Sequence, residues 1–80
     1  MEIAAKEGNE YGQLFLGELF YYGSAGQDYE KAFNWYLKAA KQGNALSQNV
    51  IGYMYHKGFG CDRNQTAAKI WFKKAVKQRY

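Results

Sequence analysis

The sequence predicts an all-α chain, an α/α solenoid of two antiparallel helix–turn–helix repeats with four main helices. Three observations predict it. The 80 residues contain an internal repeat of about 35 residues, apolar residues recur at the helical period in each unit, and glycine pairs separate the helical segments. Proline, the commonest helix breaker, is absent, and eight Tyr, five Phe and two Trp offer large apolar area from few positions. A chain of this length makes at most one domain.

The internal repeat is visible in the letters of the sequence. The segment AAKEGN at residues 4–9 returns as AAKQGN at residues 39–44 and, degraded, as AVKQ at residues 75–78. Self-similarity at a fixed period is typical of repeat architectures. With one residue added in the second loop, the same spacing pairs Gln13 with Gln48, Leu16-Gly17 with Ile51-Gly52, Phe20 with Tyr55, Gly23 with Gly58, Asp28 with Asn64, Ala32 with Ala68, Trp35-Tyr36 with Trp71-Phe72, and Lys38 with Lys74.

The first helix of unit one is expected at residues 10–22, and its counterpart in unit two at residues 45–57. In both segments the apolar residues recur at the helical period rather than in alternation. Glycine reaches the left-handed conformation that a helix C-terminus and a tight turn require, so two glycine pairs are expected to end these helices. The pairs are Gly23 with Gly26, and Gly58 with Gly60.

The second helices are expected at residues 29–42 and 65–78. Each follows a residue suited to the helix N-cap, Asp28 in unit one and Asn64 in unit two. A side-chain oxygen at that position accepts hydrogen bonds from backbone amides that have no partner inside the helix. The two caps therefore fix where each second helix begins.

Gly17 and Gly52 lie in the middle of the first helices, where glycine costs about 1 kcal/mol relative to alanine. We interpret that cost as a sign that two helix backbones approach closely there. Trp35 and Trp71 are expected to fill the wider part of each helix pair. The small residues that would meet the glycines from the second helices are Ala32, Ala39, Ala68 and Ala75.

Two segments carry a resemblance to a known family. Residues 51–60 read IGYMYHKGFG, and residues 32–43 read AFNWYLKAAKQG. This pattern resembles the Sel-1-like repeat, a relative of the tetratricopeptide repeat, over nearly the whole chain. The resemblance implies a solenoid fragment that acts as an adaptor in protein complexes. It divides the chain into the tail of a preceding repeat at residues 1–8, repeat one at 9–43 and repeat two at 44–80.

The resemblance also selects candidate binding residues. In tetratricopeptide repeats the first helix of each pair lines a concave face that binds a peptide or a partner protein. Tyrosines on such a face suit an interface because they bury large area at low entropic cost. The other interpretation is that several of them only pack between neighbouring helices. The candidate protein-binding residues are Tyr11, Leu14, Glu18, Tyr21, Tyr22, Leu46, Asn49, Tyr53, His56 and Lys57.

Two alternative functions stay open. Repeat arrays have open ends, so the chain would form a homo-oligomer if the ends stacked between copies. The C-terminal third holds seven basic residues against Asp62 alone, and Lys69, Lys73 and Lys77 recur at i, i+4 and i+8. A solvated helix face is the plainer interpretation of this basic stripe. Binding of nucleic acid is the other interpretation, and it is disfavoured because no nucleic-acid motif accompanies the lysines.

Catalysis is not expected from this sequence. His56 is the only histidine, and the single Cys61, five residues away, lacks the orienting group and oxyanion hole of a Cys–His nucleophile. No second residue at metal-ligand spacing accompanies the histidine. The segment GFG at residues 58–60 lacks the lysine of a phosphate loop. We therefore expect no catalytic residue, no cofactor and no metal, and the short apolar runs give no reason to expect a membrane partner.

Overall fold

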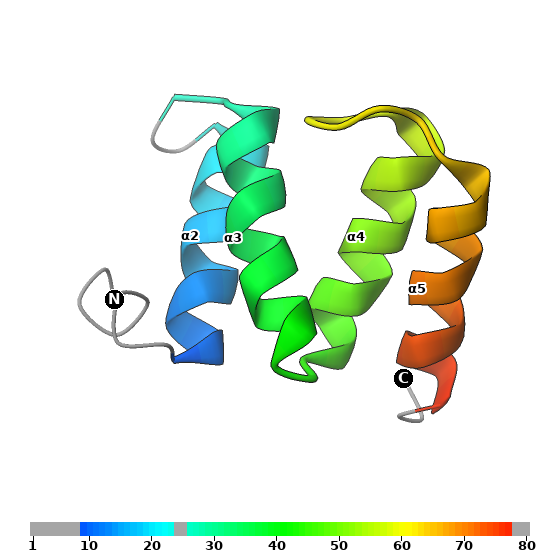
Figure 1. Cartoon of the computed structure of the whole chain (residues 1–80). Helices are drawn as coiled ribbons and strands as arrows, with labels where there is room; N and C mark the ends of the chain where they lie inside the picture. Colours follow the sequence, from blue (N-terminus) through cyan, green and yellow to red (C-terminus); the bar gives the residue numbers. More distant parts are fainter. Residues whose placement is uncertain (1–8, 24–25, 78–80) are drawn as a thin grey trace.

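The computed structural model describes residues 9–23 and 26–77, which contain four α-helices and no strand. Figure 1 shows the helices as two antiparallel pairs arranged side by side. Within the first pair α2 packs on α3, within the second α4 packs on α5, and α3 joins the pairs by packing on α4. The predicted all-α repeat architecture is therefore confirmed. The helices are α2 (Glu10–Tyr22), α3 (Tyr29–Lys41), α4 (Ala45–Lys57) and α5 (Gln65–Lys77).

The helix boundaries agree with the sequence prediction to within a residue. The helix expected at 29–42 ends at Lys41, and Gln42 stands as its C-terminal cap. The helix expected at 65–78 is described as far as Lys77, and residue 78 lies outside the described residues. The expected tail of a preceding repeat at residues 1–8 also lies outside them.

Every helix begins behind a polar side chain that accepts hydrogen bonds from its first turn. The predicted caps Asp28 and Asn64 are confirmed, because their Oδ1 atoms accept from the amides of Lys31 and Ala67 at 3.1 and 3.0 Å. Two further asparagines, in the repeated Gly-Asn pairs at residues 8–9 and 43–44, cap α2 and α4 in the same way. Each such cap contributes about 1 kcal/mol.

Glycines end the two first helices, as the sequence predicts. Gly23 (φ 86°) and Gly58 (φ 76°) take the left-handed conformation, and their amides donate to carbonyls in the last turns of α2 and α4. Gly60 has a second reason to be glycine. An alanine Cβ there would overlap the backbone carbonyl of Tyr29, so the second loop can lie against the start of α3 only without a side chain.

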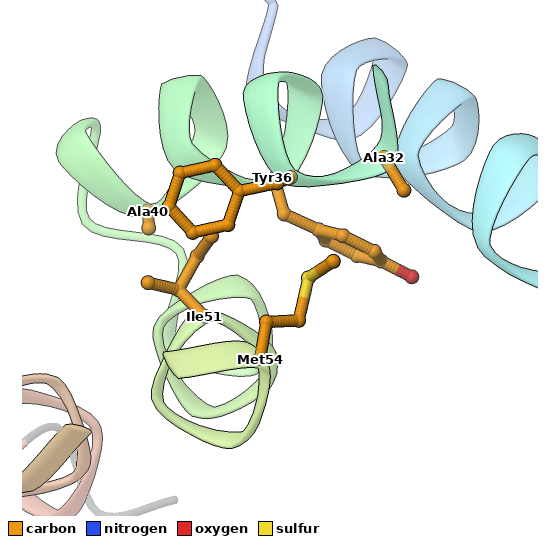
Figure 2. Close-up of a cluster of buried hydrophobic side chains, with 6 residues drawn as sticks. Ala32, Tyr36, Ala40, Ile51 and Met54 are labelled. Atoms are coloured by element: carbon orange, nitrogen blue, oxygen red, sulfur yellow. The ribbon is translucent and has the colours of Figure 1, made fainter. Parts of the chain in front are cut away.

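The cluster of fully buried apolar side chains lies between the two pairs. Ala32, Tyr36 and Ala40 of α3 and Ile51 and Met54 of α4 point toward one another in Figure 2, and each is at most 2% exposed. Full burial of a large aliphatic or aromatic side chain contributes roughly 1.5–3 kcal/mol. The contact between repeats is therefore a true core, and the two pairs stabilise each other.

Gly17 and Gly52 do allow a close approach, but the prediction that two backbones meet there is wrong. An aromatic ring fills each gap, Tyr36 opposite Gly17 and Phe72 opposite Gly52. Trp35 is correspondingly not the residue that fills the first interface. It is half-buried, and the Lys38 ammonium lies over its ring at 4.4 Å.

Candidate functional site

Aromatic and polar side chains line a hollow between the first helices of the two repeats. Helices α2 and α4 supply its walls, and one ring from each second helix reaches into it. Its volume is about 270 Å³. We call this feature the tyrosine hollow, and its lining residues are Tyr21 and Tyr22 of α2, Tyr36 of α3, Asn49, Val50 and Tyr53 of α4, and Phe72 of α5.

The mid-helix glycines explain how rings from the second helices reach a hollow between the first helices. A Cβ at Gly17 would lie 3.0 Å from carbons of the Tyr36 ring, and a Cβ at Gly52 would lie 2.8 Å from carbons of the Phe72 ring. Without a side chain at these positions the rings can lie flush against α2 and α4. Each repeat therefore has a glycine that weakens its first helix, and the missing side chain leaves room for one aromatic ring in the hollow.

Ring contacts tie the tyrosines to both repeats. The Tyr21 ring lies 4.9 Å from Tyr22 at an interplanar angle of 68°, 5.5 Å from Tyr29, and 6.2 Å from Tyr36 at 81°. Phe59, in the loop of repeat two, stacks on Tyr29 at 4.7 Å and meets the Tyr53 ring at 6.0 Å. Such pairs contribute about 0.5–1.5 kcal/mol each, so the walls of the hollow are held in place before any ligand binds.

The polar groups of the hollow are hydroxyls and one amide. Tyr36 is only 2% exposed, and among the described residues no group forms a hydrogen bond with its hydroxyl. Burial raises the pKa of Tyr36, and the nearby Glu18 carboxylate raises it further. Burial also raises the pKa of Tyr21, with a further contribution from Tyr53. Both phenols therefore stay protonated at neutral pH.

The structure brings four of the ten candidate residues together in the hollow: Tyr21, Tyr22, Asn49 and Tyr53. They come from different repeats and are separated by more than 25 residues across the two helices. Four more continue the same helix faces, because they lie three, four or seven residues away along α2 and α4. These are Leu14 and Glu18 on α2, and Leu46 and Lys57 on α4.

Two candidates lie elsewhere. Tyr11 is 65% exposed in the first turn of α2 and does not line the hollow. His56 faces the other helix of its own pair, since its Nδ1 lies 2.8 Å from Oε1 of Gln65 at the start of α5. The Gln65 amide also donates to the His56 carbonyl at 3.3 Å, so this contact joins α4 to α5.

Three lining residues were missed from the sequence. Val50 lies three residues from Tyr53, so helical spacing alone places it on the same face. Tyr36 and Phe72 stand at equivalent places in the repeat, directly after the tryptophans. The sequence feature that points to both is the mid-helix glycine opposite each ring. The missing side chain leaves space for an aromatic ring as well as for the close approach of a backbone.

The family follows from a direct match. A Sel1 repeat family model matches the chain twice, at residues 10–44 and 45–80. The chain belongs to the Sel1 repeat family. Sel1 repeats generally mediate protein–protein interactions and are a non-catalytic type of scaffold. The recognition made from the sequence motifs is thereby confirmed.

Curated relatives share this pattern over most of the chain. A Saccharomyces cerevisiae chitin synthase regulator is 44% identical over 50 residues, which are 62% of this chain and 7% of that protein. An Arabidopsis thaliana ERAD-associated E3 ubiquitin-protein ligase component, HRD3B, is 32% identical over 91% of this chain and 12% of its own length. Human sel-1 homolog 2 is 36% identical over 94% of this chain and 11% of its own length. The chain thus spans about a tenth of the length of these relatives.

Solved structures share the fold. A Sel1 repeat protein from Oxalobacter formigenes superposes with a TM-score of 0.88 at 37% identity, over 92% of this chain and 31% of that one. A protective antigen of uropathogenic Escherichia coli strains, described as displaying an SLR fold, superposes with a TM-score of 0.91 at 36% identity, over 94% of this chain and 16% of that one. The helical repeat solenoid is therefore the same in all three.

The basic stripe of α5 occupies a special place in the Sel1 repeat. Counted along the repeat, Lys69 and Lys73 of α5 correspond to Phe33 and Leu37 of α3. Those two apolar side chains pack in the core that joins α3 to the next helix, where Phe33 meets the Tyr55 ring at 5.3 Å. At these two positions the face of α5 that would receive another helix presents ammonium groups, whereas Val76, the counterpart of the core residue Ala40, is apolar and 67% exposed.

Metal binding, cysteine chemistry and membrane insertion were also considered for residues 9–23 and 26–77. No group of three or more His, Cys, Asp or Glu side chains there is arranged to hold a metal ion. Burial raises the pKa of the Cys61 thiol, and its Sγ lies 3.7 Å from the Met54 carbonyl oxygen. None of the described helices is both long enough and apolar enough to span a bilayer.

Proposed function

We propose that this pair of Sel1 repeats, at residues 9–43 and 44–80, binds an extended segment of a partner protein in the tyrosine hollow and has no catalytic role. One observation carries the proposal. Tyr21 and Tyr22 from one repeat and Asn49 and Tyr53 from the other converge on a hollow of about 270 Å³ whose walls are already fixed by ring contacts. A site assembled from both repeats depends on their packing, as a solenoid binding surface does.

The chemistry of the lining supports a peptide ligand. Tyrosine combines a large apolar face with a hydroxyl that donates and accepts hydrogen bonds, which suits a chain of mixed polarity. Tyr22 is 73% exposed and Tyr53 is 41% exposed, so both offer area that a ligand would cover. A fixed wall adds little ordering cost on binding. One hollow made by two repeats is short, so we expect weak binding by the isolated chain.

Selection from a displayed peptide library against the intact chain tests the proposal. Selected peptides are expected to lose at least tenfold in affinity on Tyr53→Ala and on Tyr22→Ala, because hot-spot tyrosines commonly contribute more than about 1.4 kcal/mol. Tyr11→Ala is the matched control, since Tyr11 is 65% exposed on the same helix as Tyr22 but outside the hollow. Peptides that bind the Tyr22→Ala and Tyr53→Ala variants as tightly as the natural chain would count against this site.

Homo-oligomerisation through the open ends is the less well supported alternative. Stacking a second copy on α5 as α4 stacks on α3 would bury Lys69 and Lys73 where Phe33 and Leu37 lie in the first repeat. Burying an ammonium without a partner costs several kcal/mol. Light scattering over a concentration series is expected to give a monomer, and association that grows with concentration would favour the alternative.

A basic surface for nucleic acid is also less well supported. Lys69 and Lys73 are exposed on α5, and a solvated helix face is the plainer interpretation of such lysines. Five aromatic rings line the tyrosine hollow, whereas Trp71 is the aromatic residue of α5 outside it. Binding of a single-stranded oligonucleotide that weakens steeply with salt would reverse this ranking.

A further inference from the structure

The rings around the tyrosine hollow turn their faces in different directions. Tyr21 meets Tyr22 at 68° and Tyr36 at 81°, so the three rings form steep corners and not a flat stack. The face of an aromatic ring carries the negative end of its quadrupole and attracts a cation. Several ring faces around one small hollow are the arrangement that recognises a cationic side chain.

The lining of the hollow has no basic group that would bind an anion. None of its seven lining residues carries a charge. The carboxylate of Glu18, on α2, lies close enough to the Tyr36 phenol to raise its pKa. The ammonium of Lys57 lies 5.9 Å from the centre of the Tyr53 ring, so this ring already attracts one cation at the margin. An acidic ligand would find no basic donor inside the hollow.

Two polar groups of the hollow, on Tyr36 and Asn49, can accept hydrogen bonds from a ligand. The Tyr36 hydroxyl belongs to a side chain that is 2% exposed and forms no hydrogen bond within the described residues. Tyr36 lines the hollow, so its hydroxyl can accept a hydrogen bond from a donor that a ligand supplies. The exposed side chain of Asn49 adds a carbonyl oxygen at the α4 wall. A guanidinium has five donors in one plane and also stacks on aromatic faces.

We propose that the tyrosine hollow binds an arginine side chain of the partner peptide. The guanidinium lies against the rings of Tyr21, Tyr22 and Tyr53 and donates to the Tyr36 hydroxyl and to the Asn49 amide oxygen. This inference rests on the proposed function and names the residue that anchors the partner.

Titration of the whole chain with two short peptides tests the anchor. One is acetyl-Gly-Gly-Arg-Gly-Gly-amide, and the other carries citrulline, which has nearly the same shape without the charge. Binding is followed by NMR shifts of the Asn49 side-chain amide and the tyrosine rings. The arginine peptide is expected to bind about tenfold more tightly, as a partly desolvated cation–π contact allows. Equal affinity for the two peptides would overturn the inference.

A hydroxyl deletion tests the hydrogen bond separately. Tyr36→Phe keeps the ring that fills the space beside Gly17 and is expected to reduce the affinity for the arginine peptide by about three- to tenfold. Tyr55→Phe is the matched control, since Tyr55 is half-buried and does not line the hollow. Equal loss in both variants would overturn the assignment of the Tyr36 hydroxyl.

The outcomes also separate this inference from the proposed function. If library peptides depend on Tyr22 and Tyr53 but carry no arginine, the arginine anchor is wrong while the peptide site stands. If no peptide depends on either tyrosine, both the anchor and the site are wrong. Arginine enriched at one position of the selected peptides, and lost in selection against Tyr53→Ala, is the result that supports both.

Discussion

Replacement of Gly52 by alanine separates helix propensity from packing in the Sel1 repeat. In an open helix this change stabilises by about 1 kcal/mol. Here the new Cβ would lie 2.8 Å from Cδ1 and Cε1 of Phe72, closer than carbon atoms approach without something shifting. Overpacking of this kind costs about 1–3 kcal/mol. The difference predicts a net loss of up to about 2 kcal/mol in the free energy of unfolding.

Urea unfolding followed by circular dichroism at 222 nm measures this loss. Asn34→Ala, on an exposed position of α3, calibrates the propensity gain alone and is expected to stabilise by about 0.5 kcal/mol. In a Phe72→Ala background the space opposite Gly52 is free, so Gly52→Ala should then stabilise by up to about 1 kcal/mol. Stabilisation by Gly52→Ala in the natural chain would refute the role assigned to the glycine.

Three further predictions concern other parts of the chain. The fully buried Ser47 hydroxyl has no hydrogen-bond partner among the described residues, so Ser47→Ala should raise the free energy of unfolding by about 1 kcal/mol in the same urea assay; a loss would reveal a hidden partner. Lys69→Phe with Lys73→Leu restores the apolar residues of α3 on α5 and should cause association that grows with concentration in light scattering, whereas the natural chain stays monomeric. Burial raises the pKa of Cys61, so at pH 8 a smaller fraction of the thiol is thiolate in the folded chain than in the unfolded chain. Cys61 should therefore react more slowly with a disulfide reagent in buffer than in denaturant, and equal rates would contradict the burial.

The sequence was sufficient for the fold because its local signals agree with one another. The 35-residue repeat, the caps Asp28 and Asn64, and the glycines that end the first helices each locate a boundary without reference to tertiary contacts. The helix pairs then follow, since antiparallel packing is the usual outcome of two amphipathic helices joined by a short loop.

The site was harder to predict because it depends on which ring fills a space. The resemblance selected Tyr21, Tyr22 and Tyr53 as candidates, and the structure places all three around the hollow. The sequence alone could not select Tyr36, because the choice between Trp35 and Tyr36 at the Gly17 gap depends on the angle at which α3 crosses α2. That angle is set by packing of whole helices and has no local sequence signal.

His56 is placed differently from the other candidates on α4. The resemblance selected His56 for the concave face, whereas in the structure its Nδ1 lies 2.8 Å from Oε1 of Gln65 of α5. A residue at the border of two helix faces can turn to either, and the nearest hydrogen-bond partner decides. That partner lies nine residues away, across the loop between α4 and α5.

Mapping a bound peptide onto the structure by NMR tests the central claim most directly. In a titration of the isotope-labelled chain with the best peptide selected from a library, the claim predicts the largest shift changes at Tyr21, Tyr22, Asn49 and Tyr53, in both repeats together. Resonances of α5 residues on the basic stripe should stay in place. Largest changes at Lys69, Lys73 and Lys77, or changes confined to one repeat, would contradict a binding site built jointly by the two repeats.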